Sequence, residues 1–385
     1  MQVLRYSNLD QLVPLAGDWD RLTRAVPFRS WAWTTTWWRH YGTLKEGPAG
    51  RQLFVLGVRD EGDRLVGLAP WFVHRSASHG NVVRFLGTGE VCTDYLSVLC
   101  ESDKLDAVAA ALADWLTRAA NGPGPDRWDL LCWEGVDAED QAVRRVSDEF
   151  AQRGHTIHSR PGPNCWRIEL PASWEEHLAA LSKDHRKQLR RTERDYVATG
   201  RAVLHTVAGK RDLETALPIL IDLHQRRRQE LGEPGCYRSR RFAAFHPDVM
   251  PQLLENGQLQ LHWIELDGRP AAAEYHLAGG GVVYAYQAGI EPDLLEHAPG
   301  RLANMMTIRR AIEMGYRAFD FLRGDEPYKA HWRAQPRAGI ELRVVPNRVS
   351  ARLRHTVWLA GVGMKRWLKS GLRPATSNKQ DKRTH

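Results

Sequence analysis

Apolar and polar positions alternate along two similar stretches of the chain. The first stretch predicts a strand–turn–strand over 52–74, a third strand at VVRFLG, a helix over Leu105–Ala119 and a strand over Trp128–Trp133. The second stretch repeats this order of three strands, a helix and a strand over 259–278, 281–290, 301–314 and 319–322. The shared order predicts a mixed-sheet α/β protein built by duplication of one domain. Convergence of two unrelated domains on a common layout is the alternative.

Glycine and proline mark the breaks between these stretches. NGPGP at 121–125 lies between a helix and a strand and predicts a loop, whereas PGP at 161–163 precedes a new strand. We therefore predict an N-terminal domain over 1–162, a second domain over 163–348, and an amphipathic helix with a basic tail over 349–385.

A single helix is predicted from Trp174 to about Thr199. One face carries mostly apolar residues, namely Leu178, Leu181, His185, Leu189 and Tyr196. The other face is basic and carries Lys183, Lys187, Arg190, Arg191 and Arg194. This pattern favours a solvated amphipathic helix, and a surface for an anionic ligand is the alternative.

Charge is distributed unevenly along the 385 residues. The net charge is +8, and 351–385 alone contain nine basic residues and one acidic residue, which leaves forty-five of each sign in 1–350. A uniformly basic DNA-binding body is therefore excluded. With 43% hydrophobic and 26% charged residues, the composition is typical of a globular protein.

The sequence predicts a cytoplasmic protein without a metal. No apolar run approaches the ~18 residues of a membrane-spanning helix, and the first fifteen residues lack a signal-peptide pattern. The five cysteines are scattered and show no CxxC spacing, which disfavours both a disulfide framework and a zinc site. Cys236 is predicted to be a plain thiol, because no base is placed beside it.

The densest group of polar side chains is FDFLRGDEPYKAHW, residues 319–332. It follows a predicted strand directly, and ligands of α/β domains usually bind just past a strand's carboxyl end. A salt-bridged loop is the alternative. A second candidate is Tyr286–Leu302, where Pro299-Gly300 opens a helix whose backbone N–H groups, with Arg301, suit an anion. The alternative there is a simple helix start.

Together these segments resemble the CelD/BcsL-like acetyltransferase family, a FemAB-related branch of the GNAT superfamily. The resemblance is carried by LRGDEPYKAHW (322–332), the basic stretch LSKDHRKQLRR (181–191), His224 with its following arginines, and PFRSWAWTTTWWRHYG (27–42). It implies two tandem GNAT-like domains. It also implies acyl-CoA, most simply acetyl-CoA, held between splayed strands with its pyrophosphate at the loop before the central helix.

The resemblance and the chemistry of acyl transfer assign roles to individual residues. The matching cofactor-binding positions are Gln287, Ala288, Gly289, Ile290, Pro299, Gly300, Arg301 and Leu302. Candidate catalytic residues are Glu274, His224, Asp325 and Glu326 as bases and Tyr328 as the acid that protonates the leaving thiolate. Candidate substrate-binding residues are Arg323, Lys329, Trp332, Arg186 and Arg190. The equivalent loop of the first domain, around Glu101–Lys104, is acidic and looks degenerate.

Three functions remain open from the sequence. The first is an N- or O-acyltransferase acting on a saccharide or cell-envelope polysaccharide precursor. The second is FemAB-like aminoacyl transfer from charged tRNA, in which the basic residues of 183–194 and Arg226–Arg228 contact phosphates. The third is an inactive accessory protein of polysaccharide (cellulose) biosynthesis, which the single-glycine loop 296–301 favours and the intact LRGDEPYK element disfavours.

Two aromatic and amphipathic features complete the prediction. The five tryptophans between Trp19 and Trp38 favour core and inter-domain packing over a sugar-stacking platform. In the C-terminal helix one face is apolar and is formed by Leu353, Val357, Ala360, Met364, Trp367 and Leu368. Packing of this face on the second domain is favoured, and binding at the inner, anionic face of the cell membrane is the alternative.

Overall fold

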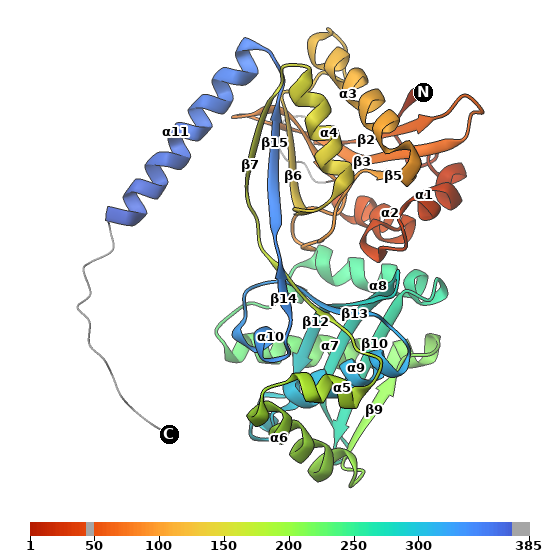
Figure 1. Ribbon diagram of the computed structural model, residues 1–385, viewed down its shortest axis with the longest axis vertical. Helices are drawn as coiled ribbons and strands as arrows, with labels where there is room; N and C mark the ends of the chain where they lie inside the picture. Colours follow the sequence, from red (N-terminus) through yellow and green to blue (C-terminus); the bar gives the residue numbers. More distant parts are fainter. Residues whose placement is uncertain (44–49, 372–385) are drawn as a thin grey trace.

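The computed structural model describes residues 1–43 and 50–371, with side chains through 361. It contains two β-sheets that lie one after the other along the long axis of the molecule (Figure 1). The first sheet has the order β1-β2-β3-β4-β6-β15-β7, and β5 pairs with β3. Its strands are β1 (Gln2–Tyr6), β2 (Arg51–Arg59), β3 (Leu65–Ser76), β4 (Gly80–Phe85), β5 (Leu99–Cys100), β6 (Leu130–Asp137), β7 (Thr156–Pro161) and β15 (Gly339–Val345). Its helices are α1 (Ala16–Leu22), α2 (Trp31–Tyr41), α3 (Leu105–Asn121) and α4 (Gln141–Gln152).

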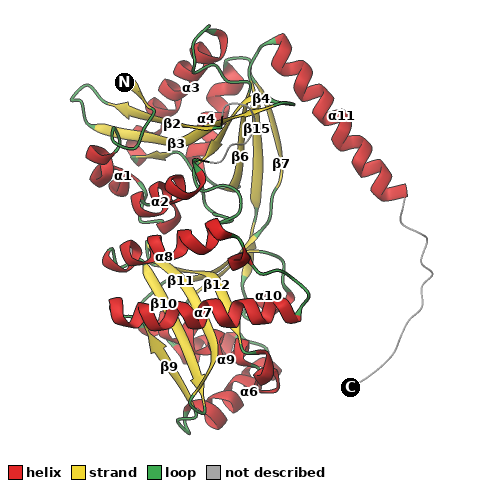
Figure 2. Ribbon diagram, turned by 180° about the vertical axis from the view of Figure 1, so that it is seen from behind, coloured by secondary structure: helices red, strands yellow, loops and turns green. Residues whose placement is uncertain are grey.

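The second sheet has the order β14-β8-β13-β12-β11-β10-β9. Its strands are β8 (Cys165–Glu169), β9 (Ala202–Thr206), β10 (Leu259–Leu266), β11 (Arg269–Gly279), β12 (Val282–Ile290), β13 (Ala318–Arg323) and β14 (Gln335–Arg337). Its helices are α5 (Trp174–Ala180), α6 (Lys183–Thr192), α7 (Lys210–Glu230), α8 (Arg240–Glu255), α9 (Pro299–Glu313) and α10 (Pro327–His331). Helix α7 crosses one face of this sheet and α9 covers the other (Figures 1 and 2).

Each sheet contains one parallel pair, β4 with β6 and β12 with β13. In both cases a helix, α3 or α9, provides the crossover that a parallel connection needs. The β12–β13 pairing is short and joins only Val282–Tyr284 to Ala318–Asp320. The predicted order of three strands, a helix and a strand is therefore confirmed in both halves, as is the mixed-sheet α/β class.

The last strand of the fold returns to the first sheet. β15 pairs with β6 on one side and with β7 on the other, both antiparallel. The predicted second domain, 163–348, therefore contains one strand of the first sheet. Residue patterns show that 339–345 is a strand but do not show which sheet it joins, because its partners lie far away in the sequence.

The helix predicted over 174–199 is wrong as a single element. Leu181 is extended, with ψ 162°, and separates α5 from α6. The Ser182 hydroxyl accepts a hydrogen bond from the backbone N–H of His185 and so caps the start of α6. The chain then ends this region in one π-helical turn, Glu193–Val197. A serine N-cap favours a new helix start over a continuous helix.

The N-terminal tryptophans pack in the core and between the two halves. Trp33 of α2 is buried, and its ring meets Phe245 of α8 and Tyr286 of β12 edge to face, at 5.0 and 5.3 Å between centroids. Trp19 and Trp37 are fully buried as well. The prediction of core and inter-domain packing is confirmed.

The C-terminal helix α11 (Val349–Gly371) contacts the first sheet rather than the second sheet. Its packed residues are Ala351, His355 and Trp358, and the Arg343 guanidinium lies 3.8 Å from the Trp358 ring centroid. Leu353 and Val357, which were expected to pack, are exposed. The prediction was wrong because Trp358, outside the aliphatic stripe, provides the larger aromatic contact. The side chains of Met364, Trp367 and Leu368, and the tail 372–385, lie outside the described residues.

Candidate functional site

A cavity of about 800 Å³ opens where β12 and β13 diverge. Beyond Tyr284 no described strand pairs with the edge of β12 that faces β13. The cavity is walled by α7 on one face of the sheet and by α6 and α9 on the other. A gap through a sheet, bordered by a strand edge and helix ends, is suited to binding an extended ligand.

Glu274 of β11 is the buried acid of this cavity. It pairs in register with Ala288, and a bulge between Tyr275 and His276 follows directly. Burial raises the pKa of the Glu274 carboxyl to about 8. Its Oε2 atom lies 3.2 Å from Nε2 of the buried His276, whose own pKa is lowered to about 3 by burial. A carboxyl with this pKa is mostly protonated at neutral pH and becomes able to accept a proton as the pH approaches 8.

Tyr328 is the second titratable group that faces Glu274. Its pKa is raised by burial and by the nearby Glu274 and Glu326 carboxylates, so the phenol stays protonated. Phe321 contacts the Tyr328 ring edge to face, with 5.7 Å between centroids. A base and an acid with separated pKa values therefore share one cavity, as proton transfer in both directions requires.

Lys329 is predicted to bind substrate, but its contacts are with the protein backbone. The side chain is 2% exposed, and Nζ donates to the carbonyl oxygens of Leu322, Arg323 and Gly324 at 3.2, 3.0 and 2.9 Å. Nζ also lies 2.8 Å from Glu326 Oε2. An ammonium has three protons, so all of them are used within this loop. Leu322 has φ 57°, and the ammonium holds that strained turn.

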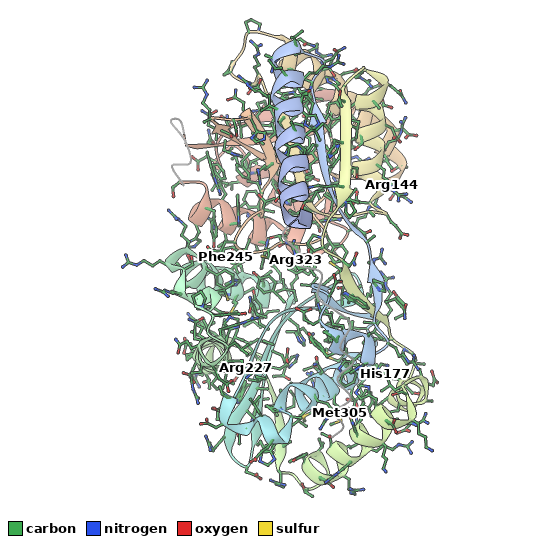
Figure 3. All side chains as sticks on the ribbon, turned by 90° about the vertical axis from the view of Figure 1, so that its left-hand side faces the viewer. Arg144, His177, Arg227, Phe245, Met305 and Arg323 are labelled. Carbon is green, nitrogen blue, oxygen red and sulfur yellow. The ribbon has the colours of Figure 1, made fainter. Side chains whose placement is uncertain are left out.

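The other charged residues of the same loop connect it to its surroundings. Arg323 Nε donates to Asp94 Oδ1 of the first half at 2.8 Å, and its guanidinium also reaches Thr93 O at 2.9 Å. Figure 3 shows Arg323 where the two halves meet. Asp325 accepts from Trp166 Nε1 at 2.9 Å and does not line the cavity. Much of the polar cluster therefore positions the loop.

His224 of α7 lies against β12. A Cβ atom at Gly289 would lie 2.5 Å from the His224 backbone N, so only glycine permits this close approach. The ring Nδ1 donates to Ala288 O at 3.0 Å, which leaves Nε2 facing Cys236 Sγ at 3.1 Å. The expectation that no base lies beside Cys236 is wrong, because the loop after α7 folds back and brings Cys236 next to His224 of that helix. Burial nevertheless raises the pKa of the Cys236 thiol to about 11.

The start of α9 forms the other end of the cavity. Gly300 and Arg301 line it, and a Cβ atom at Gly300 would meet only Ile290 Cγ2, at 3.8 Å. Pro299 has no N–H, and the N–H groups of Arg301 and Leu302 already bond to Ala298 O. The Arg301 Nε atom is buried without a partner among the described residues. A guanidinium and one free helix N–H therefore face the cavity and fit an anionic group.

The cavity brings together most of the predicted residues. Those that line it are Glu274, His224, Glu326, Tyr328, Gln287, Ala288, Gly289, Ile290, Gly300, Arg301, Arg323, Lys329 and Trp332. Asp325, Pro299, Leu302, Arg186 and Arg190 are not among its lining residues. Leu302 is buried in the core, and Arg190 instead pairs with Glu175 at 3.3 Å on the surface.

The sequence reasoning gave no role in acyl transfer to polar cavity residues on four helices. They are His185 and Gln188 of α6, Arg227 and Arg228 of α7, Asn304 of α9 and His331 of α10. Asn304 lies one turn after Gly300, so helical spacing alone places both on one face. His185 was assigned to an apolar face, and its Nδ1 in fact lies 2.9 Å from His331 O.

In the first sheet the parallel pair β4 and β6 corresponds to β12 and β13, and aromatic side chains fill the space beside it. Trp133 stacks on Trp71 at 5.4 Å and meets Phe85 at the same centroid distance. The Leu96 N–H bonds to Gly135 O at 2.9 Å and so carries the loop across this space. At the loop before α3, the Glu101 carboxylate accepts two hydrogen bonds from Arg64, at 2.9 and 2.8 Å.

Comparison with known families decides the class of the second half. Residues 183–330 match the family model of an acetyltransferase (GNAT) domain. This segment is therefore similar to GNAT acetyltransferase domains. The match confirms the prediction of an acyltransferase, and GNAT domains generally use acyl-CoA. No curated protein matches the sequence significantly.

Solved structures share the architecture of the whole chain. FemX aligns with a TM-score of 0.62 at 10% identity, over 92% of this chain and 99% of its own. A conserved protein of unknown function from Bacteroides thetaiotaomicron aligns with a TM-score of 0.54 at 11% identity, over 89% and 100%. The C-terminal domain of a putative lysylphosphatidylglycerol synthetase from Agrobacterium fabrum gives 0.52 at 12% identity, over 91% and 97%. The predicted tandem GNAT-like fold is confirmed.

Proposed function

We propose that the protein transfers an acyl group, most simply acetyl, from acyl-CoA to an amine or hydroxyl of a saccharide or cell-envelope polysaccharide precursor. The observation that carries this proposal is the buried Glu274, whose pKa of about 8 makes it a base at the floor of the β12–β13 gap. Acyl-CoA supplies the activated thioester. Gly300 and Arg301 would hold its phosphates, and the edge of β12 that faces β13 would hold its extended arm.

The residues of this chain can perform direct transfer in one step. Glu274 accepts the proton of the acceptor amine or hydroxyl as the new bond to the acyl carbon forms. Backbone N–H groups near Ala288–Ile290 stabilise the developing oxyanion. Tyr328 donates its proton to the sulfur as the carbon–sulfur bond breaks. Glu274 then releases its proton to water and Tyr328 takes one from water, so that both groups return to their starting states. The turn held by the buried Lys329 positions Tyr328.

The saccharide acceptor is supported by the polar lining of the cavity. Gln188, Asn304 and His331 offer polar side chains of the kind that pair with sugar hydroxyls, and Trp332 adds an apolar ring. The LRGDEPYKAHW element supports placing the chain in the CelD/BcsL-like branch, and the filled β4–β6 gap supports a degenerate N-terminal domain.

Calorimetric titration with acetyl-CoA and longer acyl-CoAs tests the donor site. We expect saturable binding by the native protein and its loss in Gly300→Glu, which places a carboxylate beside the expected phosphates. Glutamate in the first turn of a helix does not destabilise the helix. The matched control is Gly17→Glu, because a side chain there meets nothing within 4 Å. Absence of binding by folded native protein would refute the acyl-CoA-dependent reaction.

A second candidate, transfer from aminoacyl-tRNA, is favoured by one observation. Helix α6 contributes His185 and Gln188 to the cavity and carries exposed basic residues on its outer side, including Arg190 and Arg191. Under that function, tRNA binding weakens steeply between low and high salt. If the protein is instead an inactive accessory protein, the native chain has no turnover, so Glu326→Gln and Tyr328→Phe have no activity to remove. Both variants then keep the affinity of the native chain for its partner.

A further inference from the structure

Helix α11 is fixed to the body by one narrow face. Ala351 and His355 are buried, and the His355 ring stacks on Trp358 at 5.4 Å. Trp358 lies over Arg343 and meets His158 edge to face at 5.7 Å. These contacts occur at positions 351, 355 and 358, which is the spacing of a single helical face. The helix is therefore held in one rotation about its axis.

The opposite face of α11 is aliphatic and uncovered. Val349, Leu353 and Val357 follow at every fourth position and are 84%, 64% and 66% exposed. The helix points away from the body, as Figures 1 and 2 both show. No helix of the described residues is long and apolar enough to cross a bilayer. A large aliphatic stripe held outward on an anchored helix is typical of an interaction surface.

Charge identifies the partner of this surface. The residues of 351–385 carry nine basic side chains and one acid, whereas 1–350 are balanced. Arg352 and Arg354 of α11 flank the stripe. Arg354 pairs with Asp129 at 3.0 Å, and Arg352 donates to the Gly154 carbonyl oxygen at 3.2 Å. An aliphatic stripe combined with an excess of positive charge is complementary to a bilayer of anionic lipids, where the helix lies in the interface plane.

We propose that the Val349–Leu353–Val357 stripe of α11, flanked by Arg352 and Arg354, docks the protein on an anionic lipid bilayer. The helix lies on the surface with the aliphatic stripe between the headgroups. Because Trp358 fixes the helix on the first sheet, docking also fixes the orientation of the body relative to the membrane. This surface is independent of the acyl-transfer cavity.

Co-sedimentation of the full chain with lipid vesicles tests the proposal. We expect binding to phosphatidylcholine vesicles that contain about one third phosphatidylglycerol, and at least tenfold weaker binding to phosphatidylcholine alone. Binding should fall as salt rises from about 0.05 to 0.5 M, because the charges are screened. The double substitution Leu353→Glu with Val357→Glu should reduce binding about tenfold or more.

Met314→Glu is the matched control, since Met314 is an exposed aliphatic residue on the distant α9 end. It should bind vesicles like the native chain. Circular dichroism shows whether each variant is folded. Equal binding by the native chain and the double variant overturns the proposal. So does equal binding to neutral and anionic vesicles, or a native dimer that the double variant dissociates, because a second copy then covers the stripe.

Discussion

Arg323 of the second half is held by Asp94 of the first half, with Nε 2.8 Å from Oδ1. The Asp94 carboxylate is buried and also accepts from the Arg323 backbone N–H at 3.3 Å. The turn that carries Glu326 and Tyr328 thus begins at a residue anchored in the other half. The first half therefore positions the site through Asp94 and supplies none of the candidate reacting side chains.

Removal of this anchor should destabilise the protein. Asp94→Ala leaves a partly buried guanidinium without its carboxylate, and we expect a loss of about 2 kcal/mol in the free energy of unfolding. Denaturant unfolding measures it. Glu313→Ala breaks the exposed pair with Arg309 and should cost no more than about 0.5 kcal/mol. Equal effects of the two substitutions would show that Arg323 does not depend on Asp94.

Lys329 should act on stability rather than on substrate affinity. Lys329→Met leaves three backbone carbonyls of the 322–324 turn without their donor, which should cost about 3 kcal/mol. Glu326→Gln keeps those three bonds and should cost less than about 1 kcal/mol. Unfolding curves and the KM for the acceptor distinguish the roles. A raised KM with unchanged stability would assign Lys329 to substrate binding.

Glu274→Gln should abolish most turnover. Loss of a general base reduces kcat by roughly 10²- to 10⁴-fold, with little change in acyl-CoA affinity. In the native protein kcat should rise with pH with a midpoint near 8, since the carboxyl must lose its proton to act. Glu265→Gln, on the neighbouring strand and away from the cavity, is the control and should keep the native profile.

The same carboxyl makes stability depend on pH. The folded state keeps the Glu274 proton up to about pH 8, whereas the unfolded chain loses it near 4.5. The unfolded state therefore binds fewer protons in this window, and the free energy of unfolding falls as pH rises, by about 1.4 kcal/mol per pH unit for this group. Unfolding of the native chain and of Glu274→Gln from pH 5 to 9 measures it. A constant difference between the two curves contradicts the assignment.

Cys236 should not be a nucleophile despite its histidine neighbour. Its pKa of about 11 keeps the sulfur protonated at neutral pH. Cys236→Ala should therefore keep kcat within about threefold, and iodoacetamide should label Cys236 slowly at pH 7. Intact mass measurement after exposure to acetyl-CoA should show no acyl adduct on the native chain, and an adduct missing from Cys236→Ala would reverse this conclusion.

The sequence predicts local structure well and the use of polar groups poorly. The hairpin at Asp267-Gly268 and the helix after Pro299 follow from turn and cap chemistry, so both are found where expected. The dense 322–332 element contributes several of the residues that line the cavity. However, composition does not distinguish Lys329, which binds its own backbone, from Tyr328, which faces the cavity.

The pairing of strands that lie far apart in the sequence could not be predicted, for a different reason. The strand 339–345 alternates like any other, and its partners β6 and β7 are separated from it by about two hundred residues. The contact of His224 with Cys236 likewise depends on how the loop after α7 folds back. Both require tertiary packing that periodicity does not encode.

The return of β15 has a consequence for synthesis on the ribosome. β7 pairs only with β15 among the described strands, and β6 lacks its outer neighbour until that strand emerges. The first half is translated early but must wait for residue 345 before its sheet is complete. During this interval β6 and β7 expose unpaired edges, so nascent chains should depend on chaperones that shield strand edges until the last strand is inserted.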